Sequence, residues 1–182
     1  SAVDQIAASM HENLHMLVFS ATIPQQLNVF LKKYMKHPAI EEIPVATTIS
    51  PTIKNILIST KSQDKNNLIY QLLTMGEPYL ALVFTNTKER ADELTNYLKS
   101  QGLPVAKIHG GIPPRERKRI MKDIHRLRYQ YVVATDLAAR GIDIEGVSLV
   151  INDDIPTDLE FFIHRVGRTG RNGLPGTAIT LY

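Results

Sequence analysis

The sequence predicts an α/β fold, in which helices cover both faces of a mostly parallel β-sheet. Two observations predict it: short apolar runs alternate with amphipathic stretches along most of the chain, and the runs are apolar almost without interruption. Uninterrupted apolar strands are typical of a parallel sheet that is covered on both faces. Ligands of such sheets bind at the carboxyl ends of the strands, so functional side chains are expected there.

The first part of the chain contains one expected strand and one expected helix. Residues 14–20 form an apolar run typical of a buried strand, and residues 24–36 have helical spacing that begins with a proline. Three prolines then fall within residues 38–51, where the hydrophobic periodicity is weak. We expect this stretch to be a linker or an extended connection.

Beyond the linker, strands and helices alternate in a regular series. Asp64 and Thr87 are expected N-caps, Gly102 follows a helix end, and residues 157–160 match a capping box. We expect strands at 53–60, 79–84, 105–108, 131–134, 147–152 and 178–181, and helices at 65–74, 88–100, 115–127 and from 157 onward.

Composition restricts the function only coarsely. With 182 residues, of which 43% are hydrophobic, the chain is long and apolar enough for a real core. Its net charge of +3 is compatible with nucleic-acid binding but does not require it. The absence of cysteine excludes disulfides, thiolate catalysis and zinc sites built on cysteine. No apolar run approaches the roughly 18 residues of a membrane span, and Ser1 suggests that the chain is a piece of something longer.

The stretch HRVGRTGR, residues 164–171, places arginine at every third position with glycines between. A guanidinium group is a rigid fork of donors that fits phosphate oxygens. The chain contains no G-x-x-x-x-G-K-[ST] loop, so it cannot hold a triphosphate by itself. We interpret the stretch as arginine fingers for a nucleotide held by another lobe, and the alternative is a surface ion-pair cluster. Arg165 and Arg168 share a face if the helix continues through both.

A second stretch, ATDLAARGIDI at residues 134–144, follows a predicted strand. Asp136 is placed to cap a helix, Arg140 is expected to be exposed, and Asp143 is placed to accept hydrogen bonds from a ribose hydroxyl. The alternative is a tight strand–helix connection with a salt bridge.

The helix at 115–128 is basic, and the tripeptide HGG at 109–111 precedes it. Backbone amides at such a helix start suit a phosphate, although a charge run is usually a solvated helix face. The apolar stripe of this helix is expected to consist of Ile120, Met121, Ile124 and Leu127.

Two other patterns are interpreted as decoys. HENLH at residues 11–15 matches a zinc-protease pattern but runs directly into a predicted strand, so solvated loop histidines are the better interpretation. Asp153 and Asp154 follow a strand, as magnesium ligands do. Without a phosphate loop in the chain, we interpret both as loop acids that face another element.

Taken together, SAT at 20–22, VFTNT at 83–87, the HGG element, ATDLAARGID at 134–143 and HRVGRTGR resemble the second half of a DEAD-box ATP-dependent RNA helicase of superfamily 2. The resemblance covers essentially the whole chain and implies a RecA-like lobe. It also implies three parts: residues 1–37 as the tail of an N-terminal lobe, 38–52 as an interlobe linker and 53–182 as the C-terminal lobe.

The resemblance assigns roles to single residues. Arg168 and Arg171 are expected to reach the γ-phosphate of ATP, while Gly141 and Asp143 face the nucleotide and its ribose. Residues expected to couple the two lobes are Ser20, Thr22, His164 and Arg165. Residues expected to contact the RNA backbone are Thr87, Gly110, Arg117 and Thr135.

The implied cofactors are ATP and Mg²⁺, bound mainly by the N-terminal lobe, and the implied partners are RNA and that lobe in cis. A cytoplasmic location without a membrane partner is expected. The isolated chain is expected to be inactive, with residues 1–36 mobile or packed against a neighbour. Two alternatives stay open: a non-catalytic nucleic-acid-binding module, and a lobe of a superfamily 2 DNA helicase.

The sequence departs from the family pattern at three positions. Pro114 stands where the family usually has the glutamine of a Q-x-x-R element, although Arg117 is present. Asp153 replaces a common tyrosine, and Phe162 is a mild change of another aromatic. The first departure concerns RNA contacts, and none concerns the three arginines.

Overall fold

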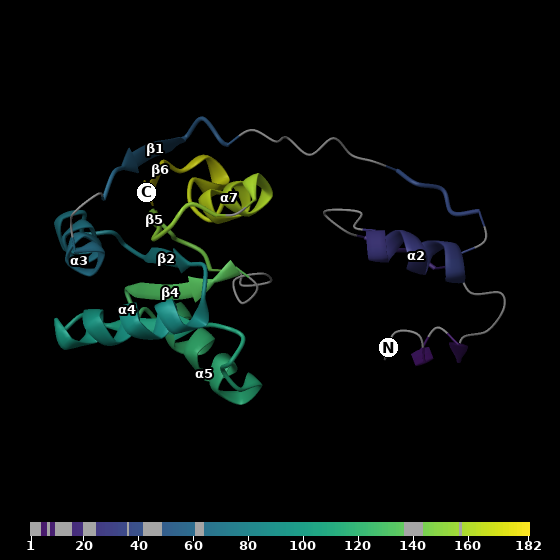
Figure 1. Cartoon of the computed structure of the whole chain (residues 1–182), viewed down its shortest axis with the longest axis horizontal. Coiled ribbons are helices and arrows are strands. Elements are labelled where there is room, and N and C mark those ends of the chain that lie inside the picture. Colours follow the sequence, from purple (N-terminus) through teal and green to yellow (C-terminus); the bar gives the residue numbers. More distant parts are fainter. Residues whose placement is uncertain are drawn as a thin grey trace. The chain divides into compact units, whose positions relative to one another are not determined.

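The chain forms two compact units, Ser1–Val45 and Ala46–Tyr182, in the computed structural model (Figure 1). The structure describes the following residues: 5–6, 8–9, 16–19, 25–35, 37–41, 49–60, 64–136, 144–156 and 158–182.

In the first unit, the expected helix is present as α2, Gln25–Tyr34. Within it, the rings of Phe30 and Tyr34 lie 5.0 Å apart. The strand expected at 14–20 is wrong for residues 16–19, which have no regular secondary structure. A strand needs a neighbouring strand to hydrogen-bond with, and the described residues of this unit supply none.

The second unit is built on a six-stranded sheet in the order β1-β6-β5-β2-β4-β3. Every neighbouring pair of strands is parallel, so all the carboxyl ends point to one edge, which we call the carboxyl edge. The opposite edge is called the amino edge. The strands are β1 (Ile53–Ile58), β2 (Ala81–Thr85), β3 (Val105–Ile108), β4 (Tyr131–Thr135), β5 (Leu149–Asn152) and β6 (Gly176–Leu181).

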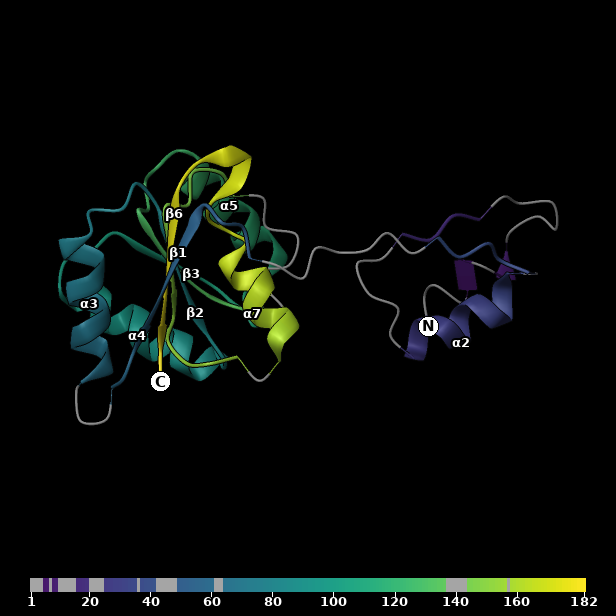
Figure 2. The ribbon, with the colours of Figure 1, turned by 90° about the horizontal axis from the view of Figure 1, so that it is seen from above.

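Helices cover both faces of this sheet, as Figure 2 shows. One face carries α3 and α4, whose buried leucines pack on β2, β4 and β5; the other carries α5 and α7, which pack through Ile124 and Val166. The predicted fold class, an α/β lobe with a parallel sheet covered on both faces, is therefore confirmed. Within the described residues of this unit, the helices are α3 (Lys65–Met75), α4 (Lys88–Ser100), α5 (Pro114–His125), α7 (Leu159–Val166) and the 3₁₀ turn η1 (Arg171–Gly173).

The helix caps are mostly those that the sequence predicts. The Asp64 carboxylate accepts hydrogen bonds from the first backbone amides of α3, and the Thr87 hydroxyl accepts one from the Arg90 amide at 3.2 Å. The capping box expected at 157–160 is wrong in its first residue. Asp158 caps α7 and accepts from the Glu160 amide at 2.9 Å, because its carboxylate lies directly before the first helical residue.

The apolar stripe of α5 is shorter than expected. Ile124 is buried and Ile120 and Met121 pack beside it, but Leu127 is 49% exposed. The helix ends before Leu127, whose φ is +55°. The amides of Leu127 and Arg128 bond back to the carbonyls of Ile124 and Asp123, which is the Schellman pattern. Because the helix ends in this way before Leu127, the Leu127 side chain does not belong to the apolar stripe.

No helix within the described residues is long and apolar enough to pass through a membrane.

Gly176, at the start of β6, has a close neighbour where a side chain would begin. A Cβ there would lie 2.6 Å from the Gly170 amide nitrogen and would also collide with the Thr169 hydroxyl. That hydroxyl cannot retreat, because it donates to the Val147 carbonyl at 2.7 Å. We expect Gly176→Ala to reduce the free energy of unfolding by about 1–3 kcal/mol, measured by urea denaturation.

The matched control is Gly110→Ala, because a Cβ at Gly110 would meet no atom within 4 Å. Its free energy of unfolding should stay within about 0.5 kcal/mol of the unaltered chain. Equal stability of the two variants would contradict the packing described for Gly176.

Candidate functional site

Three of the four residues predicted to contact RNA lie along the carboxyl edge. Thr87 follows β2, Gly110 follows β3, and Thr135 is the last residue of β4. The register pairs Thr85 with Thr135, which places the ends of β2 and β4 side by side. Arg117 lies in α5, the helix that begins just after Gly110 on the same side of the sheet. The fold thus gathers residues that are about 50 positions apart in the sequence at one edge.

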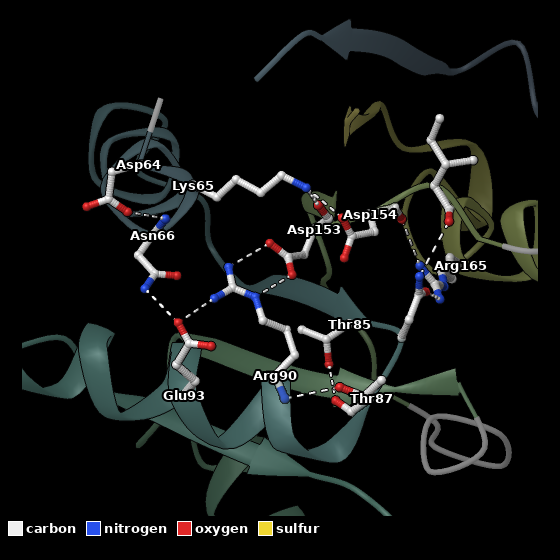
Figure 3. A network of polar contacts seen from close by, with 12 residues as sticks. Asp64, Lys65, Asn66, Thr85, Thr87, Arg90, Glu93, Asp153, Asp154 and Arg165 are labelled. Atoms are coloured by element: carbon white, nitrogen blue, oxygen red, sulfur yellow. Dashed lines mark hydrogen bonds and ion pairs between the residues drawn. The ribbon is translucent and has the colours of Figure 1, made fainter. Parts of the chain in front are cut away.

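Thr87 lies exposed at this edge and also caps helix α4. It is exposed, and its hydroxyl oxygen accepts the amide of Arg90 as the cap of α4. Its carbonyl accepts a hydrogen bond from the Thr85 hydroxyl at 3.0 Å, as Figure 3 shows. Because the cap uses only a lone pair of the Thr87 hydroxyl, its proton stays available for a ligand oxygen.

Arg165 is buried at the same edge, with 2% of its surface exposed. Its Nε and Nη2 donate to the two carboxylate oxygens of Asp136 at 2.6 and 2.5 Å. Nη2 also donates to the Asn86 side-chain oxygen at 2.8 Å, and Nη1 reaches the Asp154 carbonyl at 3.4 Å. The guanidinium group lies over the Phe84 ring, 5.4 Å from its centroid. One arginine therefore ties together the ends of β4, β2 and β5.

The placement of Arg165 bears on two expectations. Arg165 and Arg168 do not share a helical face, because α7 ends at Val166 and Gly167 is its C-cap. Asp136 was expected as a helix cap, with a connection that contains a salt bridge as the alternative for its stretch, and its carboxylate is the bidentate partner of Arg165. The coupling role predicted for Arg165 stays a prediction, and His164 is half-buried next to it in α7.

Arg168 and Arg171 lie at the amino edge instead. The turn that carries them is fixed there by two hydrogen bonds: Thr169 donates to the Val147 carbonyl, and Thr52 donates to the Gly170 carbonyl at 3.3 Å. Both arginines line an open pocket of about 620 Å³, together with Tyr79, Glu145, Gly146, Val147, Ser148, Gly170, Leu174 and Pro175.

Ligands of parallel sheets bind at the carboxyl ends of the strands. The predicted RNA residues lie at that edge, whereas the predicted arginine fingers do not. These two sets of residues lie at opposite edges of the sheet. The reason is that α7 crosses one face, so that the turn after it lies next to Val147, just before β5. Four of the predicted site residues lie outside the described residues: Ser20, Thr22, Gly141 and Asp143. The same holds for Arg140 and for HENLH at 11–15.

Sequence reasoning missed Arg90, which organises the acids after β5. Its Nε and Nη2 donate to the two carboxylate oxygens of Asp153 at 2.7 and 2.9 Å, and Nη1 donates to Glu93 at 3.0 Å (Figure 3). Asp153 is fully buried, and its hydrogen bonds raise the pKa of Arg90 above its ordinary value. A cation in the first turn of a helix is unfavourable because it opposes the helix dipole. The position of Arg90 in the first turn of α4 was therefore the sequence signal that it has an acidic partner.

The neighbouring acid is held in a similar way. Lys65, the first residue of α3, donates to Asp154 at 2.5 Å and to the Asp153 carbonyl at 3.2 Å. The prediction that Asp153 and Asp154 face another element is therefore confirmed, with Arg90 on α4 and Lys65 on α3 as the partners. The described residues contain no group of three or more histidine, aspartate or glutamate side chains that could hold a metal ion.

The sequence profile of one family matches most of the second unit. It is described as the helicase conserved C-terminal domain, and the match covers residues 64–173. The chain belongs to this helicase family. Its relatives carry DEAD-box names, so the resemblance drawn from the motifs is confirmed.

Curated relatives extend the similarity to nearly the whole chain. The DEAD-box ATP-dependent RNA helicase CshB of Listeria monocytogenes is 57% identical over 180 residues, which are 99% of this chain and 41% of that protein. CshB of Bacillus subtilis is 50% identical with the same coverage. The chain thus spans about two fifths of the length of these relatives.

A solved structure shows the same architecture. The structure of S. cerevisiae Dbp5 bound to RNA and ADP BeF3 matches with a TM-score of 0.80 and 31% sequence identity. The match covers 98% of this chain and 48% of the Dbp5 chain.

Proposed function

We propose that this chain is the C-terminal part of an ATP-dependent DEAD-box RNA helicase, which couples ATP binding and hydrolysis to local unwinding of RNA duplexes. The observation that supports this most is the gathering of Thr87, Gly110 and Thr135 at one edge of a helicase lobe. Relatives of the chain are named ATP-dependent RNA helicases, and the Dbp5 structure holds RNA and a nucleotide analogue. The proposed location is the cytoplasm.

The nucleotide half of the proposal concerns the amino edge. Arg168 and Arg171 face an open pocket there and would donate to the γ-phosphate of ATP, which a second lobe holds with Mg²⁺. Gly141 and Asp143 would contact the nucleotide and its ribose, while Ser20, Thr22, His164 and Arg165 would couple the lobes. The isolated chain is inactive in the proposal, because it contains no G-x-x-x-x-G-K-[ST] loop and the second lobe would hold the triphosphate.

The RNA half concerns the carboxyl edge. A hydroxyl, an exposed glycine amide and a guanidinium group suit phosphate oxygens and ribose hydroxyls, and they carry no means of reading a base. Binding would therefore be independent of sequence and would weaken as salt rises. Closure of the two lobes around ATP would bend one RNA strand along this edge and so separate a short duplex.

Arg117→Ala is expected to weaken binding of single-stranded RNA and to reduce the slope of log affinity against log salt by about 1, because one phosphate contact is lost. Fluorescence anisotropy of the full-length protein with labelled RNA at several salt concentrations measures both quantities. The loss should be equal for RNAs of unrelated sequence.

Arg128→Ala is the matched control, because Arg128 precedes β4 and lies at the amino edge, where it pairs with Asp123 at 3.2 Å. Its affinity and salt slope should equal those of the unaltered protein. An unchanged slope for Arg117→Ala would remove Arg117 from the proposed RNA surface.

The choice of RNA over DNA has its own test. RNA should stimulate ATP hydrolysis by the full-length protein, whereas DNA of the same sequence should stimulate it at least tenfold less, because the surface recognises 2′-hydroxyls. Equal stimulation would favour a DNA helicase, and the absence of any ATP hydrolysis would favour a non-catalytic binding module.

A further inference from the structure

His109 connects helix α4 to the turn that carries Gly110. It directly follows β3 and is nearly buried, with 7% of its surface exposed. Its Nε2 lies 3.1 Å from a carboxylate oxygen of Asp92 on α4. Its Nδ1 accepts the backbone N–H of Gly111 at 3.1 Å. Both ring nitrogens are therefore engaged, one with a helix and one with the exposed turn.

These contacts fix the tautomer of the ring. A backbone N–H only donates, so Nδ1 of His109 must be the unprotonated nitrogen, and Nε2 carries the proton that is donated to Asp92. Asp92 is held as a carboxylate, because its hydrogen bond with the Lys107 ammonium group lowers the pKa of Asp92 below its ordinary value. Lys107 and Asp92 thus hold the neutral imidazole in the orientation that the Gly111 amide requires.

The result is an anchored turn with one unpartnered donor. The carbonyl of His109 accepts the Ile112 amide at 3.1 Å, and its ring accepts the Gly111 amide. Among the described residues, none accepts a hydrogen bond from the amide of Gly110. Gly110 is exposed, and a Cβ added there would meet nothing within 4 Å. The space around this amide is therefore open to a ligand.

We infer that His109 is a positioning residue for RNA: oriented by Asp92, it fixes the Gly110–Gly111 turn so that the Gly110 amide donates to a phosphate oxygen of the RNA backbone. The inference rests on the proposed function, because it concerns the same carboxyl edge. It adds a residue that never touches RNA, and it gives His109 a specific task, which is to accept from Gly111 through Nδ1.

Two substitutions separate this task from simple packing. In His109→Asn, the side-chain oxygen stands close to the place of Nδ1 and still accepts from Gly111, whereas the bond to Asp92 is lost. In His109→Gln, the terminal amide nitrogen stands close to the place of Nε2 and still donates to Asp92, whereas the acceptor for Gly111 is lost. Each variant thus retains one of the two ring contacts.

For the full-length protein and labelled single-stranded RNA, we expect His109→Gln to weaken binding about tenfold or more, as for a lost hydrogen bond to a charged group. His109→Asn should stay within about threefold of the unaltered protein. Amide hydrogen exchange of Gly111 is the second readout: the Gly111 amide should lose protection in His109→Gln and keep it in His109→Asn.

The matched control is His125→Gln, an exposed histidine at the end of α5, which should change neither readout. Should His109→Gln fail to fold, Gly111→Ala replaces it, because a Cβ on Gly111 would lie 3.1 Å from Nδ1 and displace the ring. It too should weaken RNA binding several-fold.

Three results would count against the inference. If His109→Gln and His109→Asn bind RNA equally well, the acceptor at Nδ1 has no part in binding, and the proposed function stands without it. If His109→Asn is as defective as His109→Gln, an acceptor for the Gly111 amide is not enough to preserve binding, and the specific task assigned to Nδ1 is wrong. If the unaltered protein binds no RNA, the proposed function is wrong and the inference fails with it.

Discussion

Arg168→Ala is expected to lower the RNA-stimulated ATP turnover of the full-length protein about a thousandfold. An arginine finger neutralises charge that develops on the γ-phosphate in the transition state, and its contribution to the rate is typically 10³–10⁵-fold. Because this interaction strengthens in the transition state, the turnover number should fall while the KM for ATP changes little. Steady-state kinetics at saturating RNA measures both parameters.

The backbone around Arg168 is held by hydrogen bonds that this substitution does not remove. Arg168 lies after the C-cap of α7, and its backbone amide donates to the Arg165 carbonyl at 3.1 Å. The turn itself is held by the Thr169 hydroxyl on the Val147 carbonyl, which the substitution does not alter. Removing the Arg168 side chain should therefore leave the course of the backbone unchanged.

Two variants complete the test. Arg168→Lys keeps the charge but not the planar fork, so it should recover only part of the lost turnover. Arg128→Ala removes an arginine from the same edge of the sheet and should turn over ATP at the unaltered rate. A loss below tenfold in Arg168→Ala would exclude this residue as an arginine finger.

Local signals predicted much of the second unit. Helix α4 at 88–100 and strand β3 at 105–108 have the predicted bounds, because Thr87 caps the helix and Gly102 follows it with a φ of +83°. Such signals act through the backbone of a few consecutive residues, so they are readable without the fold. The parallel sheet followed from the apolar character of its strands.

What the sequence did not reveal depends on contacts between distant residues. Arg165 and Asp136 are 29 positions apart, and nothing local distinguishes a buried structural arginine from an exposed one. The same holds for the placement of Arg168 at the amino edge, which depends on how α7 crosses the sheet. In the first unit, the expected strand fails at 16–19, because apolar character predicts a strand only where a neighbour can accept its hydrogen bonds.

Arg90→Met is expected to reduce the free energy of unfolding by about 3–5 kcal/mol, because it leaves the carboxylate of Asp153 buried without its partner. Asp153 is 0% exposed, and both of its oxygens accept from Arg90. The Lys65 ammonium group lies near, but it bonds to the Asp153 carbonyl and to Asp154, not to the Asp153 carboxylate. Urea denaturation of the chain measures the effect.

The double variant Arg90→Met with Asp153→Leu should recover much of this loss, because it removes both charges and refills the space with apolar groups. The surface pair of Arg128 and Asp123 is the matched control. The Arg128 side chain is 63% exposed, so Arg128→Met should cost less than about 1 kcal/mol.

The two arginine–aspartate pairs use the same chemistry, and they differ in burial. If Arg90→Met costs no more than Arg128→Met, then water reaches Asp153, and the pair does not fix the end of β5. If the predicted difference is found, the pair of Arg90 and Asp153 fixes the start of α4 at the carboxyl edge. Thr87 is then fixed too, because its hydroxyl accepts a hydrogen bond from the Arg90 backbone amide. Weaker RNA binding by Arg90→Met is then expected as well, because Thr87, which is proposed to contact RNA, would move with it.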